Sequence, residues 1–452
     1  ITTGIALDAL EPEEAITLAC RRLGLMALPP PIAQLIRDRA GGNPFFTEEL
    51  AYALREGGFL TIEKGECRLA PGVDIDRIAL PNTVEGVVSE RIDRLAPDQQ
   101  LSLKVASVLG RSFPERLLCS IHPVETEAAK VVEHLNAFQA AYLALLETHL
   151  PERVYIFKHL ITQQVAYNLM LFSQRRDLHR AVARWHEAEH AANLAPFYPM
   201  LAYHYSKAED TAKAIQYLEL AGRYAVSNFS NEEAIGFLRQ AMAFDEKAPE
   251  LSDAARRATW HADLGDAYYA LGRHGESRAE LDRALTLLGH TPPRSAWRHL
   301  ASLLAGALRQ TARRVLPRPT RIPDEARRDG LLRAAAANER LCQIYYMENA
   351  KIPSMNAAVT ALNLAEPCGI SPELARSYSN VTVTTSLLNA YALSSMYERL
   401  ALDTATAAGH LPSLAFAHEV AGLYHLGAGH WQEAETRIGA ALDLAERIGD
   451  RR

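Results

Sequence analysis

Patterns that carry chemistry are scarce in this sequence. The dipeptide Gly-Lys does not occur in it, so the chain has no phosphate-binding loop of the form G-x-x-x-x-G-K-[ST]. It contains no G-x-S-x-G nucleophile elbow, and no pair of metal-binding aspartates is evident on an expected strand. We therefore expect no catalytic residue and no metal ligand set in this chain, which would work by binding rather than by chemistry of its own.

Cysteines and long apolar runs are few as well. The five cysteines are odd in number, widely spread and free of any C-x-x-C pair, namely Cys20, Cys67, Cys119, Cys342 and Cys368. This pattern favours reduced thiols over a disulfide framework or a zinc site. No apolar run approaches the roughly 18 residues of a membrane span, and no signal peptide opens the chain. We therefore expect a cytoplasmic location.

A strong charge of one sign is also missing. The net charge of -6 over 452 residues gives no reason to expect nucleic acid along the surface. Apolar residues make up 48% and charged residues 23% of the chain, as in soluble globular proteins. The length predicts about three domains. Because the first residue is Ile1 and the last expected helix runs to Arg452, we interpret the sequence as a piece of a longer protein.

A repeated spacing of small residues marks the C-terminal half. Four positions recur at intervals of 12, 4 and 3 residues, in the sets Gly222, Ala234, Leu238, Ala241; Gly265, Ser277, Leu281, Ala284; and Gly422, Ala434, Ile438, Ala441. A small residue lets a partner helix approach closely, and the larger Leu or Ile fills the gap between the helices. The segment LGDAYYALGRHGESRAELDRAL around the second set resembles the tetratricopeptide repeat (TPR) consensus.

The repeats predict a TPR-like α-solenoid over residues 193–452. Degenerate copies are expected over residues 341–365 and 374–401. Such arrays stack as quasi-one-dimensional solenoids with a concave surface. We expect that surface to bind a protein or a small-molecule effector, and the repeated Gly, Ala and Tyr residues to be structural.

An arginine-rich segment interrupts the array at residues 291–323. It contains seven arginines and no carboxylate, and large apolar residues fall near one face of an expected helix, namely Trp297, Leu300, Leu304, Leu308 and Val315. We expect this helix to cover the solenoid and to leave its arginines in water. The alternative is a basic amphipathic helix that contacts a membrane surface or an acidic partner.

The N-terminal third predicts short helices and a few strands. Residues 1–10 read as a strand of a sheet that lies upstream, and helices follow at about 12–23 and 31–40. The segment Gly42-Asn43-Pro44 then starts a further helix, with proline at the first helical position. A hairpin is expected at residues 59–69. Further helices and a strand pair at about 142–147 and 154–158 predict a winged helix, whose final strand leads into His159.

Four ordered segments in this region carry a family resemblance. GGNPFFTEEL, LPNTVEGVVSERIDRL, ASVLGRSFPERLL and YIFKHLITQQVAYNLM resemble the downstream half of a signalling ATPase of the STAND class. More narrowly, they resemble the ATPase-plus-repeat region of bacterial class III adenylate/guanylate cyclases, which is similar to that of soluble adenylyl cyclase. The resemblance implies a mostly all-α chain, with an AAA+/STAND helical lid and a winged-helix domain before the TPR-like solenoid.

The resemblance also implies a nucleotide site shared with an upstream ATPase core. Pro44 of the Gly42-Asn43-Pro44 motif would lie against the adenine of ATP or ADP, and His159 would contact the β-phosphate of ADP. The aspartate that often follows this histidine is Leu160 here, which removes a polar partner. The implied domains are residues 1–10 as the last core strand, 11–78 as the lid with its hairpin, 79–192 as the winged helix and 193–452 as the repeats.

The expected function is that of a regulatory fragment of a nucleotide-dependent switch controlling a class III cyclase. Its partners would include the upstream ATPase and cyclase domains. Two alternatives remain, a LuxR/MalT-like ATP-dependent transcription regulator fragment and a non-enzymatic TPR scaffold. DNA binding by the winged helix is not expected, because residues 123–135 carry three glutamates and only one base, Lys130. His179 and His186 are expected at the surface.

Overall fold

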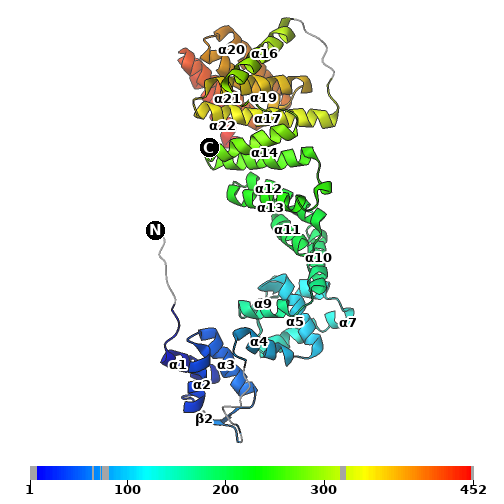
Figure 1. Cartoon of the computed structure of the whole chain (residues 1–452), viewed down its shortest axis with the longest axis vertical. Helices are drawn as coiled ribbons and strands as arrows, with labels where there is room; N and C mark the ends of the chain where they lie inside the picture. Colours follow the sequence, from blue (N-terminus) through cyan, green and yellow to red (C-terminus); the bar gives the residue numbers. More distant parts are fainter. Residues whose placement is uncertain (1–7, 64–65, 72, 74–80, 316–321, 449–452) are drawn as a thin grey trace. The chain divides into compact units, whose positions relative to one another are not determined.

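The chain is mostly α-helical, as expected (Figure 1). The computed structural model describes residues 8–63, 66–71, 73, 81–315 and 322–448. They fall into two compact units, Ile1–Asp210 and Thr211–Arg452. None of the helices in these described ranges is both long and apolar enough to cross a membrane.

The first unit begins with three helices and a hairpin. These elements are α1 (Pro12–Leu23), α2 (Pro30–Ala40), α3 (Pro44–Glu56), β1 (Leu60–Glu63) and β2 (Glu66–Leu69). Each helix has proline in its first turn, where the missing N–H costs nothing, and α1 and α2 end at left-handed glycines. The hairpin lies where the sequence predicts it, with β1 antiparallel to β2. A shared core is formed by residues such as Ile32, Ile36, Leu50 and Leu54.

A helical segment with a small sheet follows. Its elements are α4 (Val84–Asp93), α5 (Pro97–Leu109), β3 (Ser112–Pro114), α6 (Glu115–Ile121), α7 (Glu125–Ala128), α8 (Val131–Ala140), β4 (Ala144–Thr148), β5 (Val154–Phe157), α9 (Leu160–Asn168) and α10 (Phe172–Glu189). The three strands are antiparallel in the order β3-β5-β4. Phe113, Phe138 and Phe157 are fully buried in the core that these elements share.

The strands differ in detail from the expectation. The first strand of the expected pair begins at Ala144 rather than Tyr142, because Tyr142 has a left-handed backbone with φ of 54° and belongs to the turn after α8. Strand β3 was not anticipated, since three residues are too few for a visible alternation. The strand expected at residues 1–10 falls mostly outside the described residues, and Asp8–Leu10 are not in a strand.

His179 and His186 of α10 were both expected at the surface, and this prediction is wrong for His179. His179 is 1% exposed, and its Nδ1 lies 2.8 Å from Nδ1 of His204 in α11 (Tyr198–Lys207). Its Nε2 lies 3.1 Å from the hydroxyl of Tyr167. Burial, followed by the charges of Lys207 and Arg175, lowers the pKa of His179 to about 4. Burial, with neighbouring histidines, lowers the pKa of His204 to about 3.

This histidine pair predicts acid sensitivity. Both pKa values are lower when folded than the ordinary 6.5, so the stabilising contribution is complete above pH 6.5 and is lost as the pH falls toward 4. Protonation would also place two N–H donors face to face. We expect the free energy of unfolding to drop by about 2–4 kcal/mol between pH 7 and pH 5. Urea denaturation at the two pH values measures this change.

A matched pair of variants isolates the effect. His204→Gln should reduce the loss of stability at pH 5, whereas His149→Gln, at an exposed position, should leave it unchanged. Equal stability of the wild-type chain at both pH values would contradict the assignment.

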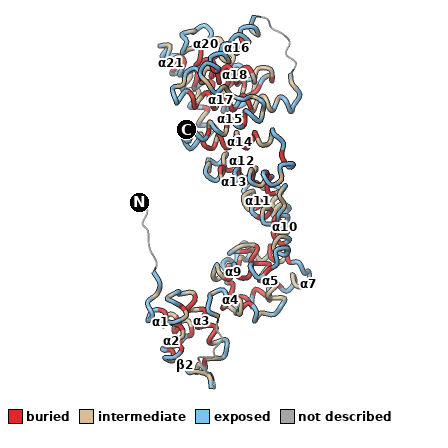
Figure 2. Tube along the Cα trace, in the orientation of Figure 1, coloured by how far each residue is buried: buried red, intermediate tan, exposed pale blue. Residues whose placement is uncertain are grey.

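The second unit is built from five consecutive helix pairs and one additional helix. Its elements are α12 (Thr211–Ser227), α13 (Asn231–Asp245), α14 (Ala254–Ala270), α15 (His274–Leu287), α16 (Ala296–Val315), α17 (Glu325–Met347), α18 (Lys351–Ala365), α19 (Pro372–Leu387), α20 (Tyr391–Ala408), α21 (Leu411–Ala428) and α22 (Trp431–Ile448). The turn of each pair has one left-handed residue, in order Phe229, Gly272, Asn349, Asn389 and Gly429. A continuous core runs from α15 to α21. Figure 2 shows this core as buried segments among exposed turns.

The repeated small residues lie where the paired helices touch. A Cβ on Gly222 would meet Leu238 at 2.9 Å, and one on Gly265 would meet Leu281 at 2.7 Å. In α21, a Cβ on Gly422 would meet Ile438 at 2.6 Å. Each glycine therefore contacts the residue 16 positions further on, and the carbonyl oxygen of the residue 12 positions further on lies 3.4–3.7 Å from the same Cβ.

The degenerate copies at residues 341–365 and 374–401 are helix pairs as well. Ser277 Oγ donates a hydrogen bond to the carbonyl of Gly265 at 2.7 Å, 12 residues back. Ser354 Oγ makes the same bond to Cys342 at 3.0 Å, so cysteine takes the place of the glycine. In the next pair, the hydroxyl groups of Thr385 and Ser394 lie 2.8 Å apart. A serine hydroxyl is therefore also present at the helix contact in the two pairs that lack the glycine.

The arginine-rich helix α16 packs on α18 and so covers the solenoid, as expected. Arg298 and Arg309 are exposed, also as expected. The sequence did not show which side of the helix is buried. His299 and Gln310 are buried and Leu303 packs against the core, whereas most of the other large apolar side chains point outward, with Leu304 62% and Leu308 71% exposed.

The glycine contacts predict the cost of adding a single carbon. Gly265→Ala should destabilise the chain by about 1–3 kcal/mol, because Leu281 must move to admit the new methyl group. Thermal or urea denaturation measures the change. Gly236→Ala in α13 is the control, since open space surrounds its added Cβ; it should stabilise the chain by up to about 1 kcal/mol. Equal effects of the two substitutions would refute the close approach.

Candidate functional site

The Gly42-Asn43-Pro44 segment forms a tight entry into α3. Gly42 has a left-handed backbone with φ of 75°, and a Cβ there would lie 2.6 Å from the carbonyl oxygen of Leu10. Leu10 N–H donates to the Gly42 carbonyl at 2.8 Å. This close approach of two backbones accounts for glycine at position 42.

Asn43 and Pro44 start the helix. Asn43 is the N-cap residue, and its Oδ1 accepts a hydrogen bond from Phe46 N–H at 3.0 Å. Pro44 occupies the first helical position and is exposed. The motif thus has a complete structural role, while the proline ring stays accessible to a ligand.

His159 lies at the end of β5 and forms the N-cap of α9 without a capping side-chain hydrogen bond. Its Nε2 is buried and has no hydrogen-bond partner in the described part of the chain. A buried polar atom without a partner costs free energy, so it calls for a specific explanation. Leu160, which follows it, is 51% exposed and offers no polar partner.

The fold brings these two motifs together, although they lie 115 residues apart in sequence. Phe45, next to Pro44, contacts His159, with the two ring centroids 4.1 Å apart. Of the four residues predicted for the site, His159 makes this aromatic contact, and Pro44 is the chain neighbour of its partner Phe45. Gly42 and Asn43 act through the backbone that positions Phe45.

Three cations and two carboxylates lie around this contact. Lys158 pairs with Glu48 at 3.2 Å, and the buried Arg91 pairs with Glu49 and also donates to the carbonyl of Ala141. The guanidinium of Arg22 lies over the ring of Tyr142, 4.4 Å from its centroid. These cations lie on α1, α4 and the end of β5, and residue spacing alone does not show that they meet.

Burial, and next the charge of Lys158, lower the pKa of His159 to about 4, while Glu48 opposes the shift. Arg91 and Arg22 lower it further. The imidazole is therefore neutral at pH 7, and its Nε2 can donate or accept one hydrogen bond. Beside three cations, that nitrogen suits a hydrogen bond to an anionic ligand such as a phosphate.

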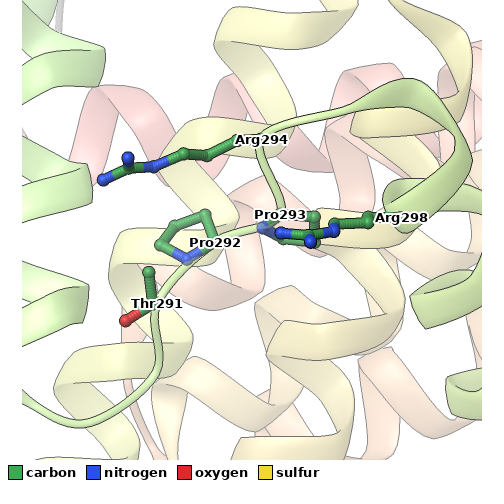
Figure 3. Close-up of a pocket in the computed structure, with 5 residues that line it drawn as sticks. All are labelled: Thr291, Pro292, Pro293, Arg294 and Arg298. Atoms are coloured by element: carbon green, nitrogen blue, oxygen red, sulfur yellow. The ribbon is translucent and has the colours of Figure 1, made fainter.

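The second unit contains a separate hollow at the start of α16. Figure 3 shows Pro292 and Pro293 next to Thr291 and the arginines Arg294 and Arg298, which line it. An overlapping hollow of about 500 Å³ extends to Asp282 and Tyr345. Burial raises the pKa of Asp282, and burial followed by the charge of Asp282 raises that of Tyr345 to about 12. The sequence did not indicate this hollow.

One group of potential metal ligands occurs among the described residues. Ligand atoms of Asp98, Glu127 and His134 lie within 4.8 Å of one another. His134 Nε2 is 3.5 Å from Asp98 and 3.8 Å from Glu127, and Ser102 Oγ lies 2.8 Å from its Nδ1. Lys130 already pairs with Glu127 at 3.2 Å. Glu127 Oε2 is buried without a hydrogen-bond partner among the described residues. The members of the group lie too far apart in sequence to form a recognisable motif.

The expectation of no metal ligand set overlooked a pattern in α10. Residues 186–190 read His-Glu-Ala-Glu-His, which matches the H-E-x-x-H pattern of zinc proteases. The two rings stack on Phe197, with the His190 centroid 3.8 Å from it. In the part of the chain that the structure describes, no third ligand atom completes a metal site there. These histidines pack as aromatic rings.

Comparisons with known proteins give partial likenesses. A family model described as a domain of unknown function (DUF8739) matches residues 11–68, which hold α1–α3 and most of the hairpin. Adenylate cyclase type 10 of Rattus norvegicus is 19% identical over an alignment of 330 residues, and the match covers 55% of this chain. The match covers 20% of that protein, so the chain spans about a fifth of this curated relative.

Solved structures add two likenesses at low identity. A signal transduction ATPase with numerous domains (STAND) and a tetratricopeptide repeat sensor, from Pyrococcus horikoshii, is 13% identical, with a TM-score of 0.33. The match covers 98% of this chain and 67% of the Pyrococcus horikoshii chain. A Rap protein in complex with competence and sporulation factor is 13% identical, with a TM-score of 0.38. That match covers 98% of this chain and 100% of the Rap chain. At such scores these likenesses say nothing about the site.

The buried Glu49–Arg91 pair predicts a large cost for removing one partner. Their side chains are 3% and 6% exposed, so Glu49→Ala would leave the Arg91 charge buried and unpaired. We expect a loss of about 3–5 kcal/mol in the free energy of unfolding, and recovery of most of it in Glu49→Leu combined with Arg91→Met. Glu48→Ala breaks a more exposed pair and should cost about 1 kcal/mol. Equal losses for Glu48→Ala and Glu49→Ala would contradict this.

Proposed function

We propose that this chain is the regulatory part of a larger nucleotide-dependent signalling ATPase. Its first unit would supply the lid and a winged-helix-type reporter, facing ATP or ADP bound to an upstream core. The observation that supports the proposal is the contact of His159, whose Nε2 is buried without a partner, with Phe45, the residue that follows Pro44. The surrounding cations Arg22, Arg91 and Lys158 favour a phosphate there.

The helix pairs of the second unit would bind the effector that sets the switch. The effector could be a protein or a small molecule. To turn a nearly closed switch into a nearly open one, it must bind the open state about 10⁴-fold more tightly than the closed state. A solenoid surface offers enough contact area for that difference. The likeness to adenylate cyclase type 10 supports a nucleotide cyclase as the output. In this role the protein would act in the cytoplasm.

Nucleotide affinity of the parent polypeptide, including its ATPase core, tests the proposal. A fluorescent ADP analogue should bind the parent but not this chain. His159→Ala should weaken binding about tenfold, the value of one hydrogen bond to a charged group, and Pro44→Ala should also weaken it. His149→Ala, at an exposed position between β4 and β5, should leave the affinity unchanged. Unaltered affinity in both site variants would leave only a repeat scaffold.

The two alternative functions predict different results when the same parent polypeptide is tested. A transcription regulator fragment of the LuxR/MalT type would show the same nucleotide dependence, with DNA binding as its output. A plain TPR scaffold would show no nucleotide dependence. Nucleotide-dependent cyclase activity of the parent, lost when the repeats are removed, supports cyclase control.

A further inference from the structure

Helix α16 is held on the second unit mainly by polar residues, together with Leu303, which packs against the core. His299 Nδ1 lies 3.3 Å from Asn356 Nδ2, and Gln310 Nε2 donates to Asn363 and Glu366 at 3.2 and 2.9 Å. Gly306 lies against Val359. These contacting residues of α16 follow one another at intervals of 7 and 4 residues, so they lie on one side of the helix over about three turns. They fix the rotation of the helix about its own axis.

The opposite face therefore presents an apolar stripe to solvent. Its five large side chains are 43–71% exposed: Trp297, Leu300, Leu304, Leu308 and Val315. They follow one another at intervals of 3, 4, 4 and 7 residues, so they lie on one side of the helix. Figure 2 shows α16 largely in the exposed colour. A contiguous exposed apolar stripe indicates an interaction surface.

The charges around the stripe are of one sign. The described residues 291–315 contain five arginines and no carboxylate. Arg313 and Arg314 are paired with Glu366 at 2.9 and 2.7 Å. Arg294, Arg298 and Arg309 are exposed, and Arg298 lies over the ring of Trp297. The free surface of α16 is thus apolar along its middle and basic at its margins.

We infer that α16 docks this protein onto an anionic lipid surface. The 20-residue helix offers a stripe about 30 Å long. Apolar side chains, including a tryptophan, would enter the boundary between headgroups and acyl chains, and the marginal arginines would meet anionic headgroups. A second copy fits poorly, because pairing two stripes would bring the arginines of both together. The inference does not depend on the nucleotide site and can fail separately from it.

Vesicle co-sedimentation of the whole 452-residue chain tests this docking. The protein should pellet with vesicles of phosphatidylcholine containing about 30% phosphatidylglycerol, and much less with phosphatidylcholine alone. Added salt should weaken the binding, because it screens the arginines. Leu304→Glu with Leu308→Glu should lower the binding by about tenfold or more. Both positions are exposed, so the variants should keep the wild-type melting temperature.

Leu442→Glu provides the matched control, because Leu442 on α22 is also 61% exposed. It should bind vesicles like the wild type. Protein that stays in the supernatant with anionic vesicles overturns the inference, and equal binding to both vesicle types overturns its electrostatic part. A dimer in solution that Leu304→Glu dissociates would show that a second copy covers the stripe, and would also overturn it.

Discussion

Two helices can share a core only where their backbones approach closely enough for the side chains to fill the space between them. In the second unit that approach permits no Cβ at the contact point of three helix pairs, as Gly265 against Leu281 shows. Other pairs meet the same constraint differently, because Ser354 turns its hydroxyl back to the carbonyl of Cys342. Since each pair needs the next to complete its core, this local contact also determines how the array extends.

The first unit depends on the first two turns of α3. Three side chains there reach different elements: Phe45 contacts His159, Glu48 pairs with Lys158, and Glu49 pairs with Arg91. Because Gly42 and Asn43 fix the start of this helix, they are explained without any ligand. His159 is different, because packing leaves its Nε2 buried without a partner among the described residues. The histidine therefore supports a ligand more strongly than the motif does.

Helices and repeat contacts were predictable because their signals are local. A proline at the start, a glycine at the end and a 12-residue interval are visible in the sequence, and the helix pairs follow them. Strand β3 and the burial of His179 were not predictable, since they depend on partners distant in sequence. The same limit applies to the site: the sequence suggested Pro44 and His159, but only folding shows the cations around them.

Helix α16 shows why amphipathic character alone does not tell which face is buried. Its sequence defines two faces clearly, and general experience favours burying the apolar one. The neighbouring helix decides otherwise, because Asn356 and Asn363 of α18 lie on the side that meets α16, with Glu366 just beyond the end of α18. Buried amides and a carboxylate need hydrogen-bond partners, and an apolar face cannot supply them. The polar face of α16 supplies partners to Asn356 Nδ2, Asn363 and Glu366, so the apolar stripe is left for a partner outside the chain.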